Sequence, residues 1–236
     1  MTDWADELAT LDASNRRLLV TAASFTDDDL RAPSVLPGWT RGHVLAHLAR
    51  NADSLGNLVT WARTGVETPA YVSDEARDAD IEAGSGRSAA ATVDDLASAS
   101  ERLADALAAL DDDGRAATVR LRDGSRLAAR ALPMIRTREL EIHHVDLLGG
   151  YRPADWPDAF VRRTLDKLAP MFAKRGNAGA HALEDDEGGR WVVGPASGPT
   201  LHSARPDLLV WLIGRALPVS VRAEPEGAGV PPSPQW

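Results

Sequence analysis

The stretch that decides the fold is IRTRELEIHHVDL, residues 135–147. At about 100° per residue, Glu139 falls on one stripe of a helix within roughly 20° to 40° of Leu132 and Ile135. His143 follows on the same stripe, one turn further on. Because an ionised carboxylate is costly to bury unless it is paired or binds a metal, this mostly apolar face predicts a partner for Glu139.

Two partners fit the spacing between Glu139 and His143: a divalent cation that both side chains bind, or an internal ion pair between them. Glu141 and His144 point away from Glu139, at roughly 200° and 140° around the helix, which predicts a solvated or flanking face for them. A metal site requires a third ligand from elsewhere in the chain.

The composition sets the class of protein. With 236 residues, 44% of them hydrophobic and 26% charged, the chain is long enough for one large domain or two small ones, and we expect two of unequal size. The net charge of -9 and the lack of a basic stripe argue against nucleic-acid binding. No apolar run reaches the ~18 residues of a membrane-spanning helix, and the acidic start Met1–Trp4 is unlike a signal peptide. We therefore expect a cytoplasmic monomer that does not contact membranes.

The chain contains no cysteine. This excludes disulfides, thiolate-ligated zinc and a cysteine nucleophile belonging to the protein. Any thiol chemistry must use a thiol supplied from outside.

Apolar periodicity and capping residues predict four long helices in the first part of the chain. The helix that holds the opening stretch should be capped by Ser125 and should end at Gly149 and Gly150, with Pro133 kinking it or marking its effective start. The other three are Trp4–Ala23, Arg41–Arg63 (between Thr40 as N-cap and Gly65 as C-cap) and Ala89–Leu110.

His47 is the candidate third ligand. It lies on the second of these helices within roughly 20° to 80° of Val44 and Leu55, on or beside the buried face, whereas His43 leans further out. An isolated histidine in this position can also be a core residue bonded to a backbone carbonyl. Joined to Glu139 and His143, it completes a set of three ligands.

Shorter segments connect the long helices. Asp27–Leu30 is predicted as a turn of helix or a loop, and 68–86 as a loop-rich connection in which Tyr71–Glu75 suggests a strand-like piece followed by a capped helical turn. The acidic run Asp111–Gly114 lacks the ligand pattern of an EF-hand and is predicted as a solvated turn. Thr118–Leu121 is a candidate short strand.

The pattern of the sequence changes after Gly150, where shorter helices and strands are expected in place of long helices. The pattern predicts an α+β protein, in which a bundle over residues 1–152 is followed by a smaller α/β domain over 153–236. The elements expected in the second domain are helices at Ala159–Phe172 and Asp207–Arg215, strands at Arg190–Val193 and Thr200–Ala204, and an edge strand at Val219–Ala223.

Several motifs together resemble the mycothiol-dependent maleylpyruvate isomerases. They are PGWTRGHVLAHL at 37–48, WARTGVETP at 61–69, Arg138-Glu139-x-x-x-His143-x-x-Asp146-Leu147, LIGR at 212–215 and the Pro-rich, Trp-terminated end. The resemblance implies a DinB-like four-helix bundle with a smaller second domain closing over the site. It also implies that His47, Glu139 and His143 bind zinc and that Arg215 is the catalytic arginine contributed by the second domain.

The chemistry of these residues agrees with what the resemblance implies. Two histidines and one glutamate leave a position open, as in catalytic zinc sites, and zinc would deprotonate a thiol that takes it. Addition of the thiolate to maleylpyruvate makes its double bond single, so the adduct can rotate and release fumarylpyruvate. Arg215 would hold a substrate carboxylate, although its position also suits a surface arginine at a helix end.

Two other functions remain open at this point. A zinc-dependent mycothiol S-transferase that detoxifies electrophiles would use the same metal site but would consume the thiol. A non-enzymatic module that binds metal or thiol would not need an open coordination position or a second domain.

Overall fold

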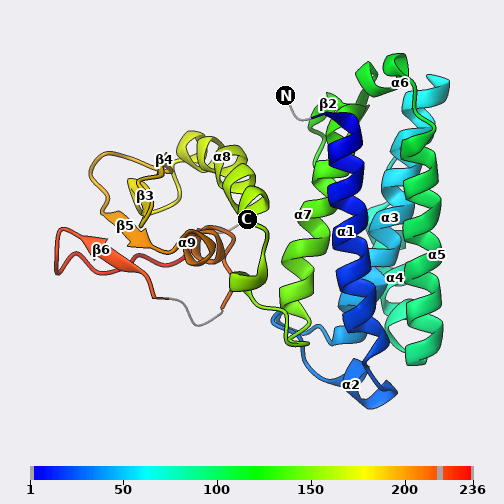
Figure 1. Ribbon diagram of the computed structural model, residues 1–236, viewed down its shortest axis with the longest axis horizontal. Helices are drawn as coiled ribbons and strands as arrows, with labels where there is room; N and C mark the ends of the chain where they lie inside the picture. The colour runs from blue at the N-terminus through cyan, green and yellow to red at the C-terminus, as the bar shows by residue number, and fades with distance from the viewer. Residues whose placement is uncertain (1–2, 217–219, 235–236) are drawn as a thin grey trace. The chain divides into compact units, whose positions relative to one another are not determined.

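The computed structural model describes residues 3–216 and 220–234. The chain divides into two compact units, residues 1–150 and 151–236. The first unit is helical and the second contains a small sheet (Figure 1), which confirms the predicted α+β class.

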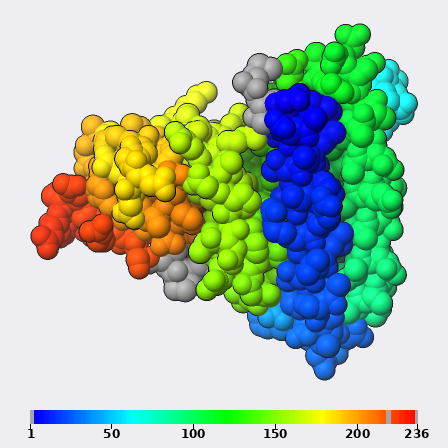
Figure 2. All heavy atoms as spheres, viewed as in Figure 1, coloured from blue at the N-terminus to red at the C-terminus, as the bar shows by residue number. Residues whose placement is uncertain are grey.

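Four long helices form the bundle of the first unit (Figure 1). Helix α3 packs against α5 and α7, and α1 packs against the same two helices. Figure 2 shows the side chains of α1 (blue) lying against those of α5 (green). The bounds are α1 Trp4–Ala23, α3 Arg41–Thr64, α5 Ala89–Ala108 and α7 Leu132–Asp146.

The capping predictions for α3 are confirmed. The side chain of Thr40 accepts a hydrogen bond from the backbone N–H of His43 at 3.4 Å. At the other end Gly65 takes φ +72° and donates its N–H to the carbonyl of Trp61 at 2.8 Å. Glycine adopts this left-handed conformation without steric cost, so it ends the helix here.

The connection over 68–86 contains a regular helix, α4 Asp74–Ser85, which Ser73 caps by accepting from the N–H of Ala76. The predicted capped helical turn is thus present and extends into a longer helix than expected, whereas Tyr71–Glu75 forms no strand and the connection is less loop-rich than predicted. Gly42 explains how α4 comes so close to α3, because a Cβ at that position would lie only 2.4 Å from the carbonyl oxygen of Ser85. The helix is thus held by tertiary packing that the local sequence does not reveal.

Short elements surround the bundle helices. α2 Asp27–Arg31 follows Thr26, and the acidic run predicted as a turn begins a short helix, α6 Asp112–Ala116, with Asp111 as its cap. The predicted strand forms as β1 Thr118–Arg120, which pairs antiparallel with β2 Arg126–Ala128.

Ser125 was wrongly predicted as a helix cap. It lies in the β1–β2 turn, where its side chain donates to Asp123, and Gly124 takes φ +81°. The chain then continues through β2 and the 3-10 turn η1 Ala129–Ala131. Helix α7 begins only at Leu132, with Pro133 in its first turn. Of the two predicted possibilities, a kink or the start of the helix, Pro133 therefore marks the start.

The second unit places two helices against a four-stranded sheet of order β4-β3-β5-β6. β3 runs parallel to β5 and antiparallel to β4, and β6 pairs antiparallel with β5 at the edge. The elements are η2 Pro153–Asp155, α8 Asp158–Arg175, β3 Ala182–Asp185, β4 Arg190–Val192, β5 Thr200–Ser203, α9 Arg205–Leu212 and β6 Arg222–Glu224.

The predictions for this unit were correct for most elements and wrong for some bounds. β3 was not predicted, and α9 ends at Leu212 rather than at Arg215. The start of the predicted edge strand, Val219, lies outside the described residues. Arg205 is buried and pairs with Asp158, Asp185 and Glu187, which joins α9 to α8 and to the turn after β3.

No helix among the described residues has the length and apolarity required to cross a membrane.

Candidate metal centre

The structure brings together three of the predicted site residues, one from α3 and two from α7. The Nε2 atom of His47 lies 3.2 Å from Oε2 of Glu139, and Nε2 of His143 lies 3.6 Å from the same oxygen. The two imidazole rings meet edge to face, with their centres 4.8 Å apart. One ligand atom from each residue lies within 4.8 Å of the others.

The two distances to Oε2 of Glu139 are close to those between neighbouring ligands of a tetrahedral metal ion. Zinc bonds to imidazole nitrogen and carboxylate oxygen at about 2.0–2.2 Å, which places neighbouring ligand atoms roughly 3.3–3.6 Å apart. The Glu139 side chain is 26% exposed, so a further ligand can approach from solvent. Two neutral nitrogens, one carboxylate and access from solvent form the donor set of a catalytic rather than a structural zinc site.

The pKa values of the three groups depend on one another. Burial raises the pKa of Glu139, but hydrogen bonds from His143 and His47 outweigh it and hold this pKa well below its usual range. Burial lowers the pKa of His143, and hydrogen bonds to Asp146 and Glu139 outweigh this and raise it. Burial lowers the pKa of His47 to about 4 despite its hydrogen bond to Glu139. The two imidazoles therefore favour an ionised Glu139, and His47 remains neutral at neutral pH.

Asp146 holds the ring of His143. Its Oδ2 lies 2.8 Å from Nδ1 of His143, and the Asp146 side chain is fully buried. Histidines that bind a metal through Nε2 usually donate their other N–H to a carboxylate in this way. The contact thus directs Nε2 of His143 toward Glu139 and supports the metal interpretation over a simple internal ion pair.

His47 has a different neighbour. Nη2 of Arg77, from α4, lies 3.3 Å from its Nδ1, and the same guanidinium lies over the ring of Tyr71 at 5.8 Å. Because a guanidinium can only donate, Nδ1 of His47 must accept and its proton must be on Nε2. Binding of a metal at Nε2 requires the proton to move to Nδ1, so Arg77 would then have to withdraw.

Both ring nitrogens of His43 have partners outside the candidate centre. Its Nδ1 lies 2.8 Å from the hydroxyl of Thr40, and its Nε2 lies 3.1 Å from a carboxylate oxygen of Glu82. The structure therefore separates His43 from the three candidate ligands, as the helical phase predicts.

The prediction of a solvated or flanking face for Glu141 and His144 was wrong, because both side chains are buried. α1 packs against this side of α7. Glu141 accepts from Ser14 and pairs with Arg17, while Nε2 of His144 lies 2.7 Å from the hydroxyl of Thr21. The sequence holds a signal that could have predicted this, because these three α1 residues follow the i, i+3, i+7 spacing of one helix face.

Three residues that support the centre were given no role from the sequence: Arg77, Arg136 and Asp146, the last of which stands in the quoted motif. Arg136 is fully buried one turn before Glu139, and burial lowers its pKa to about 10. Its guanidinium donates to the carbonyl of Leu48 at 2.7 Å and to the side chain of Asn51 at 2.9 Å. It thereby ties α7 to α3 beside the candidate ligands.

Arg215 lies in the second unit, beyond the end of α9. Gly214 precedes it at φ +67°, and the backbone N–H of Arg215 donates to the carbonyl of Val210 at 3.1 Å. Its Nη1 lies 3.4 Å from the carbonyl oxygen of Ile213.

The fold and the site define a four-helix-bundle protein with a candidate metal centre of the catalytic type. Residues 11–148 match the family model described as the mycothiol maleylpyruvate isomerase N-terminal domain. The chain therefore belongs to this family, which confirms the resemblance recognised in the sequence motifs.

Solved structures extend the likeness to the whole chain. A crystal structure of the mycothiol-dependent maleylpyruvate isomerase is 27% identical, with a TM-score of 0.93 and coverage of 100% of this chain and 98% of that one. A histidine-to-alanine variant of the mycothiol-dependent maleylpyruvate isomerase gives the same identity and coverage, with a TM-score of 0.92. No curated protein sequence is a significant match.

Proposed function

We propose that this protein converts maleylpyruvate to fumarylpyruvate in a mycothiol-dependent reaction, at a zinc centre bound by His47, Glu139 and His143. The likeness to the solved isomerase supports it most strongly, because it covers 100% of this chain and 98% of the other at 27% identity. The convergence of the three donor groups on one point supports it independently.

Zinc in this centre would lower the pKa of a thiol in its open position, and the thiolate would add reversibly to the conjugated double bond and so permit rotation. The residues of the chain prepare the centre for that chemistry. Asp146 orients His143, while burial keeps His47 neutral and able to act as a ligand at neutral pH. Arg136 fixes the spacing between the two helices that provide the ligands.

Arg215 is proposed to bind a carboxylate of the substrate and to balance the negative charge that develops during the reaction. The likeness to the family supports this role. If it is correct, Arg215→Ala should lower kcat/KM by roughly ten- to 150-fold, the value of a charge-assisted contact of about 1.5–3 kcal/mol. Arg215→Lys should recover only part of the activity, because an ammonium lacks the planar fork.

Steady-state kinetics with zinc content measured in parallel test the role of Arg215. Both variants should retain wild-type zinc, since Arg215 lies outside the ligand set. A wild-type kcat/KM in Arg215→Ala would mean that another cation holds the substrate.

The function itself is tested by following maleylpyruvate loss, first with catalytic and then with stoichiometric mycothiol. An isomerase turns over many substrate molecules for each thiol. A thiol S-transferase would consume one thiol for each product, and a binding module would give no turnover. We place the reaction in the cytoplasm, where low-molecular-weight thiols are kept reduced.

A further inference from the structure

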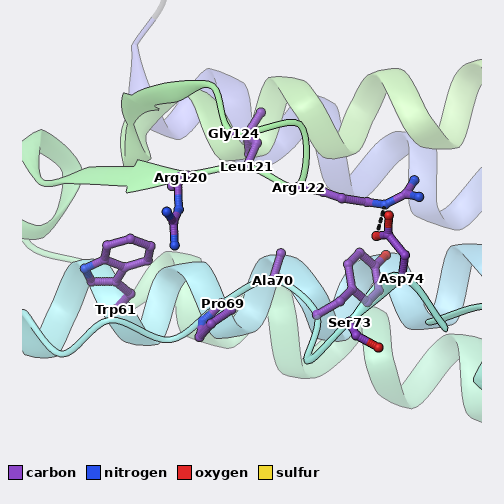
Figure 3. A pocket seen from close by; sticks show the side chains of 10 residues that line it. Trp61, Pro69, Ala70, Ser73, Asp74, Arg120, Leu121, Arg122 and Gly124 are labelled. Atoms are coloured by element: carbon purple, nitrogen blue, oxygen red, sulfur yellow. Dashed lines mark hydrogen bonds and ion pairs between the residues drawn. The ribbon is translucent and has the colours of Figure 1, made fainter. Parts of the chain in front are cut away.

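A pocket of about 260 Å³ lies in the first unit between the end of α3, the segment leading to α4 and the β1–β2 turn. Figure 3 shows Trp61 and Arg120 toward one end of this pocket and the Arg122–Asp74 pair toward the other. None of the candidate metal ligands lines it. Its volume is below the roughly 300–1,000 Å³ of a typical small-molecule site, so it suits part of a ligand.

Contacts connect this pocket to the metal centre. Tyr71 lines the pocket, and its ring lies 5.8 Å from the guanidinium carbon of Arg77, which reaches Nδ1 of His47 at 3.3 Å. At the far end, Trp61 follows His47 by 14 positions on α3, or about 21 Å along the helix. The pocket therefore extends along α3 away from the metal centre, starting one side chain beyond the residues that contact His47.

The charges of the lining are already balanced. Arg122 Nε lies 2.7 Å from Oδ1 of Asp74, and Arg120 pairs with Glu67. An anionic ligand would have to compete with these carboxylates for the guanidinium groups. The lining thus presents donors and acceptors beside two half-buried aromatic rings, Trp61 and Tyr71, and has no excess of positive charge.

This combination fits a neutral ligand with many hydroxyl groups. Alternating donors and acceptors can bind hydroxyls, and the faces of aromatic rings can pack against the C–H faces of a sugar or cyclitol ring. Mycothiol has such a part, since its cysteine is joined by an amide to a glucosamine–inositol unit. We propose that this pocket binds the hydroxyl-rich part of the thiol while the sulfur lies at the metal centre, an inference that rests on the proposed function.

The test compares two thiols on the full-length, zinc-loaded protein by titration calorimetry: mycothiol, and N-acetylcysteine as a thiol without sugar rings. Arg122→Gln changes a half-exposed side chain at the rim and should weaken mycothiol binding about tenfold, as expected for a lost polar contact. Its affinity for N-acetylcysteine should be unchanged. Trp61→Ala should have a similar selective effect.

Arg126→Gln is the matched control, because Arg126 lies on the same hairpin but does not line the pocket. It should leave the affinities for both thiols unchanged. The proposal is overturned if Arg122→Gln and Trp61→Ala both bind mycothiol as wild type does, or if Arg122→Gln loses both thiols equally. It is also overturned if the wild-type protein binds mycothiol no more tightly than N-acetylcysteine.

Failure of the proposed function would look different. The wild-type protein would then bind thiols without isomerising maleylpyruvate, and the comparison of the two thiols would still decide what the pocket binds.

Discussion

Helix α7 carries two pairs of glutamate and histidine, and the two pairs have opposite surroundings. Glu139 and His143 face His47 on α3, where the three side chains bring potential metal ligands together. Glu141 and His144 face α1, where a serine, an arginine and a threonine satisfy them. Both pairs are largely removed from water, so burial alone does not define the site.

The difference lies in what the neighbouring helix supplies. Helix α1 offers hydroxyl and guanidinium groups. These groups bond to the carboxylate and the imidazole, and so occupy the atoms that could otherwise bind a metal ion. α3 offers an imidazole, which adds a third lone pair to the same point. Buried acidic and basic groups become a metal centre where acceptors converge, and a structural network where donors meet acceptors.

The largest expected effect comes from removing a member of the first pair or its partner on α3. Glu139→Gln, His47→Ala and His143→Ala should each lower zinc affinity by more than ~100-fold, the upper range for losing only a supporting group. Metal analysis after dialysis against a weak chelator measures this. Glu141→Gln and His144→Ala should retain zinc, and a reversed pattern between His143 and His144 would contradict the assignment.

A smaller loss is expected from Asp146→Asn, because Asp146 supports a ligand without being one. Zinc affinity should fall by about 10- to 100-fold, since an amide orients the ring of His143 less strongly than a carboxylate. Competition titration with a chromophoric chelator gives the value. Unchanged affinity would mean that helix packing alone sets the orientation of His143.

The second pair should matter for stability instead. Glu141→Gln replaces a buried carboxylate that accepts from Ser14 and pairs with Arg17, so the free energy of unfolding should fall by about 1–3 kcal/mol. Denaturant unfolding of the zinc-free protein measures this. Asp12→Asn breaks the exposed pair with Arg16 on the same helix and should cost under ~1 kcal/mol.

The smallest expected effect concerns Arg77, the donor that contacts His47. Arg77→Gln should raise zinc affinity by roughly two- to tenfold, because the amide oxygen can accept the Nδ1 proton that His47 carries when its Nε2 binds metal. Arg77→Lys retains a donor and should remain near the wild-type value. Tighter zinc binding in both variants would point to the bulk or shape of the guanidinium rather than to the position of the proton, because lysine keeps both the positive charge and a donor.

The sequence predicted the long helices, the fold class and the three convergent residues, because helical periodicity reports which residues share a face. Periodicity around a single helix cannot report what covers each face. Glu141 and His144 were therefore placed in or beside solvent, although α1 covers them. Only a capped turn was predicted where helix α4 lies for a related reason, since the position of the helix depends on close contact with α3 at Gly42 rather than on its own apolar pattern.

Arg77 and Arg215 show another limit. Arg77 reaches His47 from α4, of which the local sequence predicted only a capped turn. The catalytic role expected of Arg215 came from the family motifs, because the local sequence shows only an arginine near a helix end. Contacts made by long side chains across helices depend on the three-dimensional path of the chain, and the residue pattern does not contain that path.

His47 and Glu139 are separated by 92 positions in the sequence, and they come from two different helices. An ion held between them would act as a removable cross-link that closes this long loop of chain. Ions that bind only the folded state stabilise it in proportion to the logarithm of their concentration, by about 2.7 kcal/mol at 100 times the dissociation constant. The heat resistance of the bundle should therefore vary with the free zinc of its surroundings, so that metal starvation would threaten the fold as well as the catalyst.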